Sequence, residues 1–198
     1  MLALVGAGGG RLGSRGKLHI IFYFASRHSP VIEKLVRFEP RCSGPYSEGL
    51  ERSCEDLVVL GAVTEGPGGM GLPARGGTTG GTDAEAVEML EGYKEFFNGM
   101  TDAELLAYAH LAAPEAFGDA EAHRPPVGDV DQLIMQVIRR GIISSERGAE
   151  LLGVTHDVVL DRMKGMGIRI LRQGAPTGCR ITTGPSTRQR LPCLLSPR

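Results

Sequence analysis

The sequence lacks tryptophan and is poor in aromatic residues, which make up 5% of its 198 residues. Hydrophobic residues still reach 41%, which is enough for the core of one medium domain or two small ones. Because large rings are scarce, we expect that core to consist of leucine, isoleucine, valine, methionine and alanine. The composition therefore indicates a folded chain with an aliphatic interior.

Cysteines are few, and long hydrophobic runs are missing. The four cysteines, Cys42, Cys54, Cys179 and Cys193, form no C-x-x-C pair, which argues against zinc and leaves reduced thiols as the expectation. No apolar run approaches the roughly 20 residues that a membrane span needs. The opening MLALVGAGGG also lacks the basic stretch of a signal peptide. These absences predict a cytoplasmic protein that does not contact membranes.

No set of residues typical of a catalytic centre occurs in the sequence. The five histidines lie apart, and neither an H-E-x-x-H metal motif nor a G-x-S-x-G nucleophile turn is present. We therefore expect a protein that acts by binding, not an enzyme, with no metal and no cofactor. One alternative rests on GGGRLG, Gly8–Gly13, which fits the G-x-G-x-x-G phosphate-binding pattern and suggests a nucleotide-binding enzyme.

Charge is sorted by segment, although the formal net charge is only -1. Residues 11–41 hold seven basic and two acidic residues, a net +5, whereas residues 82–121 hold one basic and ten acidic residues, a net -9. A basic segment attracts phosphate and an acidic one repels it. The expected DNA-binding residues are basic residues around the first long helix: Arg11, Arg15, Lys17 and Arg27. The alternative is a solvated basic rim without a ligand.

Residues 1–65 are predicted to form a winged-helix-like module. GKLHIIFYFASRH is apolar on nearly every side at helical spacing, which indicates a helix in the centre of its domain. LVRFEP and AVTE are typical of short strands, and Ser47 is expected to cap a helix between them. Residues 66–81, of which half are glycine, predict a flexible linker that replaces the wing.

Residues 82–170 are predicted to form a helical module. TDAE occurs twice, each time as a capping box before a short acidic helix, at about residues 83–97 and 102–112. Residues 130–138 carry an apolar helical stripe that Gly141 ends. In SSERGAELLGVTHDVVLDRM, Ala149 suits a close helix crossing and Gly153 a left-handed turn, as in a helix-turn-helix. Residues 171–198 lack such periodicity, which predicts a disordered tail.

The second helix of this helix-turn-helix is expected to bind a partner protein with its outward face. Four residues form that face: His156, Asp157, Asp161 and Lys164. Two carboxylates against one ammonium repel phosphate, whose contacts supply much of the affinity for DNA. Direct base recognition by this helix remains the alternative.

Two stretches resemble known families. RGKLHIIFYFASRH with SGPYSEGLERSCEDLVVLGAVTE, within residues 15–65, resembles winged-helix-type prokaryotic proteins of unknown function that carry an R-x-K-L helix and a G-P-Y-S turn. EFFNGMTDAELLAYAHLAAPE with VIRRGIISSERGAELLGVTHDVVLDRMKGMGI is similar to a small antitoxin-like family that ends in a helix-turn-helix. These motifs are structural, so the resemblance implies a regulator or an antitoxin and brings no active site.

Together, these observations predict a mainly α-helical fold with a small β component, divided into the two modules. The favoured hypothesis is a DNA-binding regulator of the transcription-factor or antitoxin type. Its first module would contact DNA, and its second would bind a toxin, another protein or a second copy of the chain. The alternative hypothesis is a protein-interaction adaptor that binds no nucleic acid.

Overall fold

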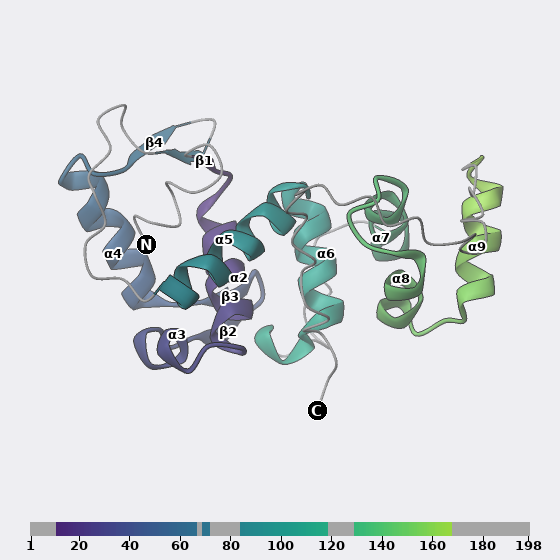
Figure 1. Ribbon diagram of the computed structural model, residues 1–198, viewed down its shortest axis with the longest axis horizontal. Coiled ribbons are helices and arrows are strands. Elements are labelled where there is room, and N and C mark those ends of the chain that lie inside the picture. Colours follow the sequence, from purple (N-terminus) through teal and green to yellow (C-terminus); the bar gives the residue numbers. More distant parts are fainter. Residues whose placement is uncertain (1–10, 67–68, 72–83, 119–128, 168–198) are drawn as a thin grey trace, which may run out of the picture.

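The computed structural model describes residues 11–66, 69–71, 84–118 and 129–167. Within these residues the fold is mainly helical with a small β component, which confirms the predicted fold class (Figure 1). Three parts of the sequence that carried expectations lie outside the described residues: Gly8–Gly10, most of the glycine-rich segment and the tail 171–198.

The first half of the chain alternates short strands with helices. Its elements are β1 (Arg11–Leu12), α2 (Arg15–Ser26), α3 (Pro30–Leu35), β2 (Glu39–Arg41), β3 (Gly44–Tyr46), α4 (Glu48–Val59), β4 (Thr64–Gly66) and β5 (Gly69–Gly71). The predicted cap is confirmed, since the Ser47 side chain accepts a hydrogen bond from the backbone N–H of Leu50. The strand predicted at LVRFEP begins only at Glu39, because Ser29 caps a helix that Pro30 starts and that runs to Leu35.

Strands β1, β5 and β4 form an antiparallel sheet in that order. Leu12 of β1 lies opposite Met70 of β5, and both side chains are buried. Gly69 has φ +93°, and a side chain there would overlap the backbone oxygen of Gly13. The prediction that residues 66–81 form a linker in place of a wing is therefore wrong for residues 69–71. There, glycine permits two strands to approach closely.

Helix α2 lies in the centre of the fold, as its all-round apolar sequence predicts. It packs on β1, α3, β3, α5 and α6 (Figure 1). The ring of Phe24 lies 5.4 Å from that of Phe97 in α5 and 6.2 Å from that of Tyr108 in α6, measured between centroids. The few aromatic residues thus gather where the two predicted modules meet, and one hydrophobic core spans both of them. The interior is not purely aliphatic, because this seam needs large rings to fill it.

The second half of the chain is helical. Its elements are α5 (Ala84–Asn98), α6 (Asp102–Ala112), the 3-10 helix η2 (Pro114–Ala116), α7 (Val130–Arg139), α8 (Ser145–Leu152) and α9 (His156–Gly165). The second predicted capping box is confirmed, since Glu104 Oε2 accepts from the N–H of Thr101 at 2.8 Å and Thr101 Oγ1 accepts from that of Glu104 at 3.3 Å. Gly141 and Gly153 have φ +71° and +63°, as their predicted turn positions require.

Helices α8 and α9 form the predicted helix-turn-helix and pack on α7. Ala149 is buried, as expected at a helix crossing. The closest approach, however, is at the neighbouring Gly148, where a Cβ atom would overlap Cδ1 of Ile138 in α7. Val159 and Met163 bury the inner side of α9. A glycine that the sequence analysis did not single out therefore makes room for Ile138 between α7 and α8.

We predict that Gly148→Val lowers the free energy of unfolding by about 1 to 3 kcal/mol, because its branched side chain overpacks the contact with Ile138. Gly49→Ala in α4 is the matched control, since nothing lies within 4 Å of its added Cβ atom. Urea denaturation measures both variants. A Gly148→Val protein as stable as the control would contradict the close packing of α7 on α8.

A second prediction concerns Glu104, whose buried carboxylate caps α6 and pairs with Arg140. Burial raises its pKa, but hydrogen bonds from Thr101 and the charge of Arg140 outweigh this effect and hold the pKa below its usual value. A folded-state pKa below the unfolded one contributes stability above the unfolded value of about 4.3, and this stability is lost as the pH falls through the folded pKa.

Glu104→Gln removes that titration and should lower stability at pH 7 by about 1 to 3 kcal/mol. The free energy of unfolding of the variant should then fall less than that of the wild type between neutral and acidic pH. Denaturation at a series of pH values measures both quantities. Parallel pH profiles for the two proteins would show that Glu104 does not carry this pH dependence.

Candidate functional site

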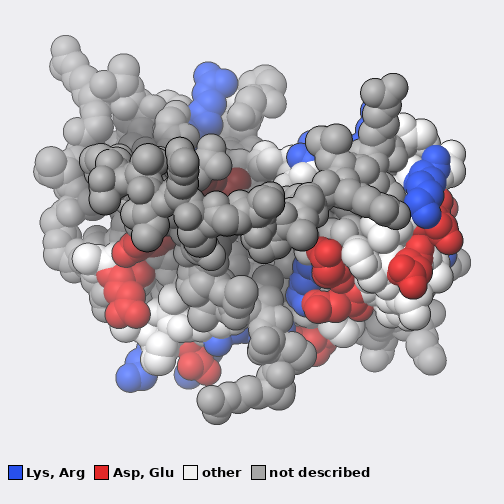
Figure 2. All heavy atoms as spheres, turned by 45° about the vertical axis from the view of Figure 1, so that its right-hand side comes forward, with Lys and Arg blue, Asp and Glu red and all other residues white. Residues whose placement is uncertain are grey.

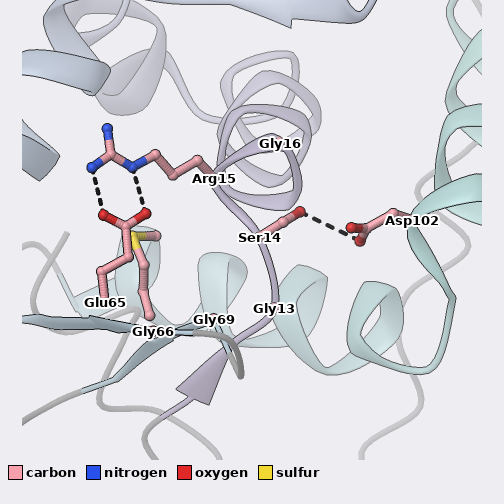
Figure 3. A pocket seen from close by; sticks show the side chains of 9 residues that line it. Gly13, Ser14, Arg15, Gly16, Glu65, Gly66, Gly69 and Asp102 are labelled. Atoms are coloured by element: carbon pink, nitrogen blue, oxygen red, sulfur yellow. Dashed lines mark hydrogen bonds and ion pairs between the residues drawn. The ribbon is translucent and has the colours of Figure 1, made fainter.

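Arg15, the first residue of α2, is the centre of a carboxylate cluster. Its Nε and Nη2 atoms donate to both oxygens of Glu65 in β4, at 2.7 and 2.6 Å (Figure 3). Its Nη1 atom donates to Glu51 of α4 and lies 3.9 Å from Glu55 Oε1. The hydrogen bonds from Arg15 hold the pKa of Glu65 below its usual range. This guanidinium ties α2 to α4 and to the sheet, which leaves its charge neutralised within the fold.

The other three predicted DNA-binding residues lie in different surroundings. Lys17 is buried, where its Nζ atom donates to the backbone oxygen of Met100 at 2.6 Å. Arg27 pairs with Glu115 of η2 at 2.6 Å. Arg11 is exposed in β1 and forms no ion pair with the residues that the structure describes. Of the four predicted residues, only Arg11 therefore presents a cation without a carboxylate or carbonyl partner.

Helix α4 follows the β2–β3 hairpin and leads into β4, where the predicted winged-helix arrangement would have its recognition helix. It carries one basic residue, Arg52, against four acidic residues, a net -3: Glu48, Glu51, Glu55 and Asp56. Over residues 11–66, eight basic and seven acidic residues leave a net +1, in place of the +5 of residues 11–41. The acidic helix thus offsets most of the basic charge of the module.

His19 sets the position of α4 from within α2. Its Nδ1 atom accepts a hydrogen bond from the backbone N–H of Ser47 at 3.1 Å, so Nε2 carries the proton that it donates to Glu51 at 3.0 Å. Its ring stacks on Tyr46 with centroids 5.0 Å apart, and the Arg41 guanidinium lies over the Tyr46 ring, 3.3 Å from its centroid. His19 is therefore a packed structural residue, as the sequence indicated, and holds the first turn of α4.

The predicted partner-binding residues all lie on α9. Lys164 pairs with Asp161 at 2.7 Å along the helix, and Asp157 is exposed. His156 is less accessible than expected, because its Nε2 atom lies 2.8 Å from Ser145 Oγ and 3.4 Å from Glu146 in α8. The outward face of α9 thus offers paired charges, while His156 links the two helices of the helix-turn-helix.

A pocket of about 670 Å³ opens at the first turn of α2 (Figure 3). Glycines form much of its wall, and its charged side chains are Arg15, Glu65 and Asp102. Arg15 is bound by Glu65, and Ser14 Oγ donates to Asp102 Oδ1 at 3.3 Å. Two carboxylates against one guanidinium repel an anion. The pocket therefore gives no support to a phosphate site on Gly8–Gly13, whose first three residues lie outside the described part.

The sequence analysis missed an exposed apolar pair at the end of α4. Val59 and Leu60 are 86% and 76% exposed. They follow Leu57 and Val58, which are half-buried and pack against the core. A run of four aliphatic residues cannot face one side of a helix, so half of it must point outward. Figure 2 shows another face of the molecule, on which acidic and basic side chains lie next to one another.

The described residues also bear on the expectations about metal sites, membrane spans and cysteines. Among the described residues, no group of three or more His, Cys, Asp or Glu side chains could hold a metal ion. None of the described helices is long and apolar enough to cross a membrane. Cys42 is exposed, Cys54 is buried, and neither forms a disulfide, whereas Cys179 and Cys193 lie outside the described residues.

We predict that Arg15→Ala lowers the free energy of unfolding by about 1 to 3 kcal/mol, because it leaves Glu51 and Glu65 without their shared cation. Arg11→Ala removes the same charge four residues earlier and should change stability by less than about 0.5 kcal/mol. Urea denaturation of both variants measures the difference. Equal stabilities would mean that the cluster contributes nothing to the fold.

No family model, curated protein or solved structure matches this chain. The resemblance to winged-helix-type proteins and to an antitoxin-like family stays a prediction based on the quoted motifs. What the protein binds has to follow from its own side chains, which place carboxylates and an apolar pair on α4 and neutralise the basic residues around α2.

Proposed function

We propose that this protein acts by binding another protein, without catalysis, and that its winged-helix-like part does not bind DNA. The observation that carries the proposal is the surface of α4. The helix in the recognition position has a net charge of -3 and ends in the exposed pair Val59 and Leu60. Adjacent exposed aliphatic residues with a polar rim are a feature of protein interaction sites.

The ion pairs around α2 also favour a protein ligand over DNA. Binding to DNA depends on cations that are free to replace the counterions of the phosphates. Arg15 and Arg27 are bound to carboxylates, and Lys17 is buried on a carbonyl oxygen. To reach a phosphate, each would have to give up a contact that stabilises the fold. The original hypothesis of a DNA-binding regulator stays a prediction, and these pairs weigh against it.

The proposal is compatible with the antitoxin part of the original hypothesis, because an antitoxin can act on its toxin as a protein ligand. It equally fits an adaptor that joins two proteins. The expectation of a homodimer also stays a prediction, which light scattering on the purified chain tests directly.

The test measures nucleic acid and protein binding in parallel. We expect fluorescence anisotropy to detect no salt-dependent binding of duplex DNA between about 50 and 200 mM salt. We also expect the tagged full chain, purified from the organism that encodes it, to retain a protein at fixed stoichiometry after nuclease treatment. DNA binding with a steep salt dependence, weakened by Arg11→Ala, would overturn the proposal. So would a partner that nuclease removes.

A further inference from the structure

We propose that the end of α4 docks a basic, amphipathic segment of the partner protein. This inference rests on the proposed function and adds the place and the chemistry of the contact. The docking surface, here called the α4-end surface, consists of Glu55, Asp56, Val59 and Leu60. Residues four apart lie one above the other on a helix, so Glu55 neighbours Val59 and Asp56 neighbours Leu60. The surface therefore combines two carboxylates with two aliphatic side chains.

All four side chains of the α4-end surface are exposed. Glu55 is 60% exposed and lies 3.9 Å from Arg15, whose guanidinium already binds Glu51 and Glu65. Asp56 has no ion pair within the part of the chain that the structure describes. Both carboxylates can therefore accept a cation from outside, and Figure 1 shows α4 at the outer edge of the molecule.

At its carboxyl end, the sequence of α4 is unfavourable for the stability of the isolated chain. The carboxyl end of a helix carries a partial negative charge, which favours basic residues and disfavours acidic ones by about 0.3 to 1 kcal/mol each. Helices α7 and α9 follow this rule, with Arg139 and Lys164 in their last turns. Helix α4 has no basic residue in its last turn and places Asp56 there, an arrangement that α5 and α8 share with Glu95 and Glu150. A cation supplied by a partner would compensate for this arrangement.

Charge decides between the candidate occupants of the surface. DNA would bring further negative charge and be repelled. In a symmetric dimer through this surface, the Glu55 and Asp56 carboxylates of the two copies would lie close together, which is also repulsive. In a partner segment with Lys or Arg beside apolar side chains, the cations would pair with the two carboxylates and the apolar side chains would pack on Val59 and Leu60. The helix-in-groove mode of recognition uses such segments, with apolar anchors at positions i, i+3 or i+4.

The probe for this proposal is a fluorescein-labelled model peptide of about 18 residues, five helical turns, with leucine on one face and lysine on the other. A second peptide carries glutamate in place of lysine. We expect the full chain to bind the lysine peptide and not the glutamate peptide, as measured by fluorescence anisotropy. Val59→Ser with Leu60→Ser should weaken binding about tenfold or more, since anchor side chains carry most of the energy of such contacts.

Two matched controls distinguish binding at this surface from nonspecific binding to other exposed side chains. Leu35→Ser alters an equally exposed aliphatic side chain (77%) on α3 and should leave the affinity unchanged. Glu55→Gln with Asp56→Asn should weaken binding and its salt dependence. Glu33→Gln on α3 with Glu95→Gln on α5 removes the same charge from exposed positions and should have little effect. Because all these residues are exposed, we expect melting temperatures no lower than that of the wild type, which confirms that each variant folds.

Equal losses in the control and α4 variants, or no preference for the lysine peptide, would overturn the docking proposal. A change in oligomeric state on mutation of Val59 and Leu60 would mean that a second copy occupies the surface, which would also overturn it. If a nuclease-resistant partner is found and still binds the Val59→Ser, Leu60→Ser variant, the docking site is wrong while the proposed function stands. If no such partner exists, the proposed function itself fails.

Discussion

The fold depends on the burial of α2 on nearly every side. A helix that packs on β1, α3, β3, α5 and α6 can leave no polar group without a partner, because an unpaired buried charge is costly. The three polar residues in its first turns are satisfied accordingly: Arg15 by carboxylates, Lys17 by a backbone oxygen and His19 by Ser47 and Glu51. Arg15 and His19 share Glu51 of α4, Arg15 also reaches Glu65 of β4, and Lys17 reaches Met100 before α6. These three polar residues of α2 therefore hold α4, the sheet and the start of α6 in place around it.

This constraint changes what the basic residues mean for function. Judged by composition, the net +5 of residues 11–41 favours phosphate binding. In the fold, Arg15 and Arg27 each meet an acidic residue that lies at least 36 positions away in the sequence. Helix α4 presents an acidic surface, whereas Arg11, Lys34 and Arg37 are exposed and form no ion pair with the other described residues. The proposed partner, a protein with basic side chains, complements the surface of α4.

The two predicted modules are coupled more closely than separate domains would be. Phe24 of α2 lies among Tyr93, Phe97 and Tyr108 of α5 and α6, so the first module completes its core with helices from the second. Aromatic pairs at these distances add about 0.5 to 1.5 kcal/mol each beyond the area that they bury. The two halves of the chain therefore share one continuous hydrophobic core.

The sequence by itself determined the features that depend on neighbours within about four residues. The Ser47 cap, the Thr101–Glu104 capping box and the turns at Gly141 and Gly153 follow from local hydrogen bonds and backbone angles, and all are confirmed. Tertiary structure alone decided which distant groups meet. Residues 69–71 form a strand only because β1 and β4 lie on either side of them. Arg15 became structural because the fold brings it to Glu65, fifty residues away, and Val59 and Leu60 became exposed because the rest of α4 already covers the core. A local pattern fixes the shape of an element, but the charge that it presents depends on partners that only the folded chain brings together.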